Sequence, residues 1–325
     1  MREVTFLKQN AEKWKRFEGL ISDKFVKPNP NELTDLFVEL TDDLSYAQTY
    51  YPESKSTKYL NTLAARVHQS IYKNKKEDSS RLVTFWTREI PLVIRSAHKE
   101  ILISFIIFLL SVFVGALSMN KDDRYVRSIL GDGYVNMTEE NIKNKDPFGV
   151  YKQEEGYEMF VRIAYNNVRV GITFFLSGLF FGLGPIYLIF KNGIMLGVFH
   201  YLFYKHGLLG QSLAVIWIHG TIEMSTMIVA GGTGFVLAKS FLMPQTFSRI
   251  TSFINGAKAS MKIMISLIPL IVFAAVLESW VTRFTDMPFL LNMFIVFGSL
   301  AFILWYYVAY PILLERRISN SRGQL

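Results

Sequence analysis

The sequence contains no cysteine among its 325 residues. A chain without cysteine has no disulfide framework, no thiolate zinc site and no cysteine nucleophile. Acidic residues are scarce in the second half, where residues 168–314 contain only Glu223, Glu278 and Asp286. Half of the chain is hydrophobic, and 27 residues are phenylalanine, which is more than a soluble domain of this size usually contains. This composition predicts a chain that is largely embedded in a membrane.

Common catalytic motifs are absent as well. The sequence has no G-x-S-x-G, no H-E-x-x-H and no C-x-x-C. Its net charge of +8 could indicate nucleic-acid binding, but in membrane proteins an excess of Lys and Arg mostly flanks the spans. We therefore expect no nucleic-acid partner and no cofactor.

The first 98 residues lack any long hydrophobic run. Residues 1–100 contain 17 Lys/Arg and 14 Asp/Glu, and their apolar residues recur at helical spacing. A secretory signal needs an apolar stretch that this region does not have. We therefore predict a cytosolic helical domain over residues 1–98. Its last helix, around Phe85, Trp86 and Ile90, is either a helix at the headgroup level or one more core helix of this domain.

Uncharged stretches then define the first half of the membrane region. Ile101–Met119 has 19 residues without a charge, so residues 99–119 are predicted to form the first span. Residues 120–166 contain seven basic and nine acidic residues, a balance typical of an extracytoplasmic loop. Glycine and proline at Gly131, Gly133, Pro147 and Gly149 predict an irregular loop. Val168–Phe190 is predicted to be the second span.

The rest of the membrane bundle is predicted over residues 167–314, with possible re-entrant or broken helices. Residues 192–238 contain one Lys and one Glu, so they form two spans or one span with a re-entrant piece. Residues 239–262 contain four basic residues and no acidic one, which places them in the cytosol. The last spans are predicted at 263–282 and 289–314, followed by a basic cytosolic tail at 315–325.

These segments predict an all-α fold, a polytopic membrane helix bundle with an N-terminal cytosolic helical domain. The bundle has six crossings, or four and a re-entrant hairpin, and both termini lie in the cytosol. Five crossings are disfavoured because one basic segment would then lie outside.

Polar groups inside the predicted bundle are candidate functional residues, because charges at membrane depth are costly. His219 and Glu223 are four residues apart, so they share one helix face. Glu278 lies in a later span, and His200 lies in a short apolar segment. Three hypotheses stay open for this group: a metal site, a proton or ion relay, and a structural pair that orders helix packing.

Asparagine and glycine residues mark a second set of candidates for helix breaks or close helix packing. Small residues at G-x-x-x-G spacing let helix backbones approach, and asparagine caps broken helices or bonds across them. The spacing also allows self-association into a homo-oligomer. This set contains Asn166, Asn167, Gly178, Gly182, Asn192, Gly193, Gly220 and Gly231.

Several short motifs together resemble the stage II sporulation protein M-like family of integral membrane proteins. They are Met1–Phe6 with Trp14, Asn166-Asn167, Asn192-Gly193, His219-Gly220 with Glu223, Ala230-Gly231, and Glu278. The resemblance implies a membrane protein of bacteria or archaea. The namesake works with peptidoglycan-degrading partners and is thought to hold them at the septal membrane. This chain departs from it by about 100 extra N-terminal residues and a long external loop, so the resemblance does not imply sporulation.

The first functional hypothesis is a non-enzymatic scaffold or assembly factor in the bacterial plasma membrane. It would lie in the lipid bilayer and bind protein partners in the cytosol and the envelope. The second is a transporter or channel that uses His219, Glu223 and Glu278. The third is an intramembrane metal-dependent hydrolase, which rests on His219 and Glu223 alone.

Overall fold

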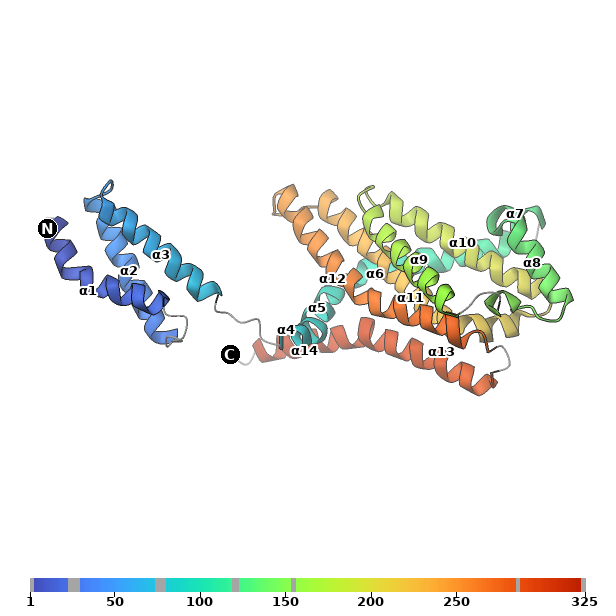
Figure 1. Ribbon diagram of the computed structural model, residues 1–325. Helices are drawn as coiled ribbons and strands as arrows, with labels where there is room; N and C mark the ends of the chain where they lie inside the picture. The colour runs from blue at the N-terminus through green and yellow to red at the C-terminus, as the bar shows by residue number, and fades with distance from the viewer. Residues whose placement is uncertain are drawn as a thin grey trace. The chain divides into compact units, whose positions relative to one another are not determined.

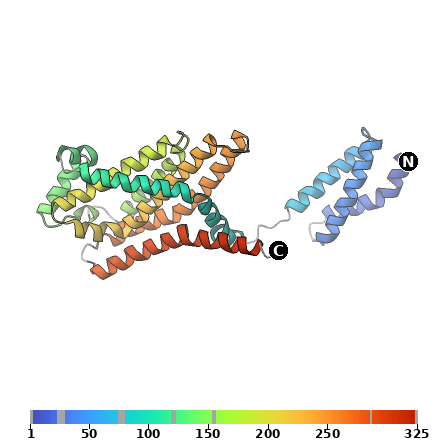
Figure 2. The same ribbon diagram turned by 180° about the vertical axis from the view of Figure 1, so that it is seen from behind.

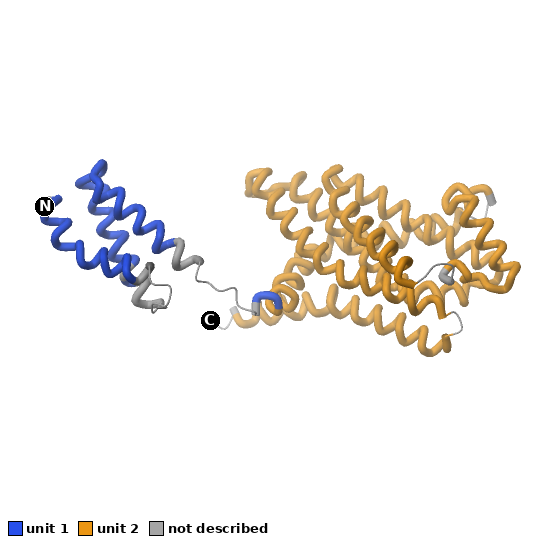
Figure 3. The backbone as a smooth tube through the Cα atoms, viewed as in Figure 1, with its two compact units in different colours: residues 1–82 blue, residues 83–325 orange. Residues whose placement is uncertain are grey.

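The protein folds into helices, and its computed structural model divides into two compact units, residues 1–82 and 83–325 (Figure 3). The structure describes residues 3–22, 30–73, 80–118, 123–152, 156–284 and 287–322, and it has no strand among them. The predicted all-α fold is confirmed for these ranges. Met119, at the end of the predicted first span, and residues 323–325 of the predicted tail lie outside the described residues.

The first unit is a small domain of three helices, α1 (Glu3–Ser22), α2 (Pro30–Tyr50) and α3 (Lys55–Lys73). Trp14 is buried in its centre, and its Nε1 donates a hydrogen bond to Asp43 Oδ2 at 2.9 Å. Lys13 Nζ lies 2.6 Å from the same carboxylate oxygen. The unit therefore has a core of its own, formed by Phe6, Trp14, Phe17, Leu40, Ala47, Leu60, Leu63, Ala64 and Val67.

The segment that follows belongs to the second unit from Val83 onward. It consists of α4 (Ser80–Thr84), a π-helical turn η1 (Phe85–Glu89) and α5 (Ile90–Ser96). Ile90 and Ile94 are buried in the core of the bundle, and the Tyr306 hydroxyl donates to the Trp86 carbonyl at 2.8 Å. The predicted domain boundary at residue 98 is therefore corrected to Leu82, because the apolar face of this segment packs on the bundle.

The second unit is a bundle of long helices that lie side by side (Figures 1 and 2). They are α6 (His98–Ser118), α9 (Gly156–Ser177), α10 (Leu183–Lys205), α11 (Leu209–Leu242), α12 (Arg249–Val276) with a π-helical turn η3 (Leu277–Val281), and α13 (Phe289–Leu304) with η4 (Trp305–Ala309) and α14 (Tyr310–Arg322). Five of these, α6, α10, α11, α12–η3 and α13–α14, are long and apolar enough to cross a membrane.

Helix α9 is the sixth long helix of the bundle and differs in composition. It carries exposed Arg162 and Arg169, yet it packs along α11 and α12. Its 22 residues make it about 33 Å long, close to the thickness of a bilayer core. If α9 also crosses the membrane, the bundle has six passes. Both described ends of the bundle then lie on the same side of the membrane.

The predicted second span, Val168–Phe190, is wrong as a single helix. The chain reverses between Ser177 and Leu183, where Phe181 has φ 53° and Gly182 has φ 89°. Left-handed backbone at Gly182 costs no Cβ clash, so this turn favours glycine. Residues 192–238, for which two spans or a re-entrant piece were predicted, lie on α10 and α11.

The loop predicted at 120–166 is largely helical where it is described, which corrects the expected irregular structure. It contains α7 (Asp123–Leu130), α8 (Asp132–Lys143) and a 3₁₀ turn η2 (Gly149–Lys152). Val126 and Val135 of these helices pack with Val198 and Leu202 of α10. This apolar contact explains why these residues form helices. The loop ends at Gly156, where α9 begins.

Glycines at the helix crossings allow close approach. A Cβ on Gly193 would meet Ser111 Cβ of α6 at 2.5 Å, and one on Gly231 would meet Ser104 Oγ at 2.6 Å. Gly220 is different, because its nearest neighbour is Ile216 of its own helix at 3.8 Å. Among the described residues, no neighbouring helix approaches Gly220 closely.

Candidate functional site

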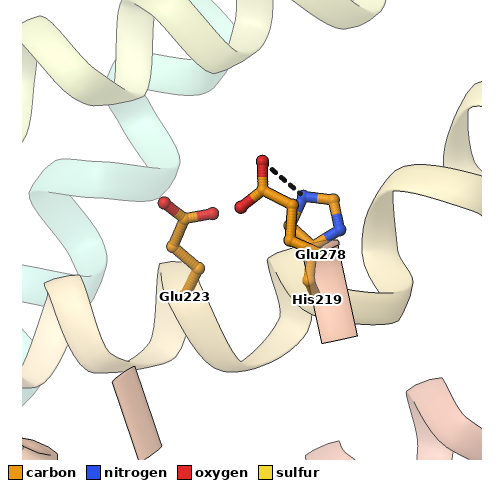
Figure 4. Close-up of side chains that lie close together, drawn as sticks. All are labelled: His219, Glu223 and Glu278. Carbon is orange, nitrogen blue, oxygen red and sulfur yellow. Dashed lines mark ion pairs between the residues drawn. The ribbon is translucent and has the colours of Figure 1, made fainter. Parts of the chain in front are cut away.

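Three ionisable side chains converge where α11 meets η3 (Figure 4). His219 and Glu223 come from one face of α11, and Glu278 comes from the π-helical turn of η3. One ligand atom of each lies within 4.8 Å of the other two, and His219 Nε2 lies 4.0 Å from Glu278 Oε1. Single π-helical turns often occur at functional sites. The helix spacing and the turn thus build one cluster from residues 219, 223 and 278.

The imidazole of His219 is oriented by Thr282. Thr282 Oγ1 lies 3.1 Å from the Leu277 carbonyl, which only accepts, so the hydroxyl donates there. The same oxygen lies 3.0 Å from His219 Nδ1, so the hydroxyl holds the ring through that nitrogen. The other ring nitrogen, Nε2, lies on the side of Glu278, 4.0 Å from its Oε1. Ligating histidines in metal sites are typically held in this way.

Charge at the cluster is unevenly compensated. Glu223 and Glu278 are close enough to repel each other, and Arg162 of α9 is close enough to attract Glu278. Asn167 and Glu223 lie in the wall of the same cavity. Glu278 is 18% exposed and His219 is 5% exposed, so water screens this group weakly. Two ionised carboxylates in such surroundings favour a proton or a cation between them.

A cavity of about 150 Å³ adjoins the cluster at Glu223. Asn166 and Asn167 of α9 and Asn192 of α10 line it together with Glu223, and apolar residues of α12 complete the wall. The cavity is large enough to hold several waters, since one water occupies about 30 Å³ of liquid. The three asparagines, predicted to mark helix breaks or close helix packing, lie inside helices and line this cavity.

His200 does not join the cluster. Trp217 Nε1 donates to His200 Nε2 at 3.1 Å, so His200 Nδ1 is left to donate to Ser212 Oγ at 3.2 Å. Both ring nitrogens are used in these bonds between α10 and α11. The predicted group of four is therefore corrected to His219, Glu223 and Glu278, with His200 in a separate structural contact.

The packing residues of the prediction lie apart from the cluster. Gly178 and Gly182 lie at the α9–α10 turn, and Gly193 faces α6. The sequence contained no signal for the part played by Thr282, because a threonine near a helix end is usually a cap or a turn residue. Only the pairing of α11 with η3 shows its contact with His219.

Fold and site together define a polytopic α-helical membrane protein with an ionisable cluster inside its bundle. Residues 104–283, which are 180 of the 325, match the family described as Stage II sporulation protein M. The chain belongs to this family. Residues 4–73 match a separate domain of unknown function (DUF8413), in agreement with the division into two units. No curated protein and no solved structure matches the chain.

Proposed function

We propose that this protein moves a small cation, a proton or a metal ion, through its membrane bundle. The observation that carries the proposal is the convergence of His219, Glu223 and Glu278 beside a cavity that Glu223 lines together with three asparagines. Charged groups inside a membrane bundle line ion pathways and proton relays, since their cost is otherwise not compensated. A structural pair would need only two partners and no cavity.

We further propose the bacterial plasma membrane as its location, with both termini in the cytosol. The support is the basic character of one end of the bundle, where α11 ends and α12 begins. Lys239, Arg249, Lys258 and Lys262 lie there without an acidic residue between them in the sequence. Cytosolic ends of membrane proteins carry such an excess of Lys and Arg.

Ion movement is tested with the purified protein in lipid vesicles that contain a pH-sensitive or a metal-sensitive dye. We expect Glu223→Gln to reduce the flux to that of empty vesicles, because glutamine keeps the shape but neither binds a cation nor exchanges a proton. Glu158→Gln, at an exposed position of α9, is the matched control and should keep the flux. Equal flux in the wild type and Glu223→Gln, or no flux in either, would contradict the proposal.

A second candidate is the scaffold role, with one protein partner in the cytosol and another in the envelope. It is favoured by the N-terminal unit, which has its own core and its own family match. Such modules add a binding surface without taking part in the bundle.

The scaffold role predicts that a specific membrane complex is lost when residues 1–82 are deleted. We expect the truncated chain to insert normally, because the bundle keeps its core, and to lose the cytosolic partner after crosslinking and mild solubilisation. The matched control is the full chain with Asp43→Ala, which weakens the same domain by about 1–3 kcal/mol without removing it. An identical set of crosslinked proteins with and without the domain would exclude this role for it.

A further inference from the structure

We infer that the cation held at this cluster is a divalent transition-metal ion of the Zn²⁺ class. The inference deepens the proposed function by naming its ion. The ligands would be His219 Nε2 and one carboxylate oxygen each of Glu223 and Glu278. One imidazole and two carboxylates suit zinc and its neighbours, whereas Ca²⁺ and Mg²⁺ prefer oxygen ligands alone.

The distances are those of a site that needs little adjustment. With metal–ligand bonds of about 2.1 Å in a tetrahedron, ligand atoms lie roughly 3.4 Å apart. Here the three ligand atoms lie within 4.8 Å of one another, and His219 Nε2 is 4.0 Å from Glu278 Oε1. Side-chain movements of about an ångström close this difference, and glutamate has three rotatable torsions with which to make them.

The contact with Thr282 is independent support for a metal ligand. Thr282 Oγ1 lies 3.0 Å from His219 Nδ1, and this contact holds the ring with Nε2 on the side of Glu278, 4.0 Å from its Oε1. Metal sites use this outer contact to keep the ligating nitrogen unprotonated and aimed at the ion.

The charge of the cluster and the cavity beside Glu223 also agree with a divalent metal ion. A divalent cation offsets the charges of both carboxylates and so removes the repulsion between Glu223 and Glu278, while Arg162 of α9 also attracts Glu278. Zinc sites that exchange a ligand keep one position open beside three protein ligands. Glu223 lines the cavity with Asn166, Asn167 and Asn192, so a fourth ligand can come from that side.

The test is metal analysis of the full chain in detergent, with any affinity tag removed, after chelation and reloading with Zn²⁺. We expect one zinc per chain, retained in a large excess of Mg²⁺. His219→Asn, Glu223→Gln and Glu278→Gln should each lose it. His200→Asn and Glu158→Gln are matched controls that change the same residue types outside the cluster and should keep it. Absence of zinc in the wild type, or equal zinc in all variants, overturns the inference.

Thr282→Val keeps the test decisive if a ligand variant fails to fold. The substitution preserves shape and removes only the hydroxyl, and we expect a loss of zinc affinity of about 10–100-fold. Thr282→Ser should restore it. Unchanged affinity in Thr282→Val would overturn the proposed role of Thr282.

The vesicle assay separates this inference from the proposed function. Proton flux without zinc binding overturns the metal and leaves the cation pathway intact. Zinc binding without any flux supports the metal site and contradicts transport.

Discussion

Gly178→Ala is expected to destabilise the bundle strongly, and Gly178→Leu is expected to prevent its assembly. A Cβ at this position would collide with the carbonyl oxygen of Gly234 on α11. A backbone carbonyl cannot rotate away as a side chain does, so α9 and α11 must separate. Overpacking costs about 1–3 kcal/mol where side chains can yield, and we expect a cost at or above that range here.

The Gly178 series has a matched control in Gly298 of α13, where an added Cβ meets nothing within 4 Å. Gly298→Ala and Gly298→Leu should leave the yield of monodisperse protein and its melting temperature nearly unchanged. The measurement is size-exclusion chromatography followed by thermal unfolding in detergent. If Gly178→Leu elutes and melts as the wild type does, α9 and α11 do not pack as described.

The position of the α9–α10 turn could not be predicted from the hydropathy profile. Residues Leu179, Phe180 and Phe181 are apolar, so the profile from 168 to 190 runs on without a break. All three are more than half exposed in the turn, which places hydrophobic residues where a soluble protein would have polar ones. Because this turn faces apolar surroundings, it has no polar residues by which the sequence would indicate a turn. Gly178, Gly182 and Gly184-Pro185 lie there in the sequence, but such residues more often indicate close helix packing.

Only part of the candidate site could be predicted from the sequence. The spacing of His219 and Glu223 follows from helical geometry and needs no tertiary information. Glu278 joins them from the π-helical turn η3, which follows α12. Such a turn has no distinctive residue pattern. The three asparagines had local explanations as caps, and their shared cavity depends on how α9 and α10 pack against α11.

Lys239→Met is the second substitution expected to have a large effect. Glu100 at the start of α6 is 6% exposed, and its Oε1 lies 2.6 Å from Lys239 Nζ of α11. Its Oε2 has no hydrogen-bond partner among the described residues. Loss of the lysine leaves a buried carboxylate without compensation, which costs about 3–5 kcal/mol in a fully buried pair. Because the lysine side chain is 49% exposed, we expect a cost near the lower limit.

The matched control is Lys262→Met, which breaks a pair of the same kind in the same unit. Lys262 Nζ lies 2.7 Å from Glu89 Oε2, but these side chains are 38% and 40% exposed. Glu89 can regain water when the lysine is removed, so the expected cost is about 1 kcal/mol or less. The free energy of unfolding of both variants is measured by reversible unfolding in mixed micelles.

A double-mutant cycle then separates the ion pair from the packing of the lysine stem. Glu100→Gln removes the charge that Lys239 compensates, so the double variant Glu100→Gln/Lys239→Met should be more stable than Lys239→Met alone. A coupling of at least about 1 kcal/mol is expected for groups in direct contact. Additive effects of the two substitutions would mean that the lysine stabilises the α6–α11 contact by packing alone. The buried carboxylate would then be neutral, and the ion pair would contribute nothing to the stability of the bundle.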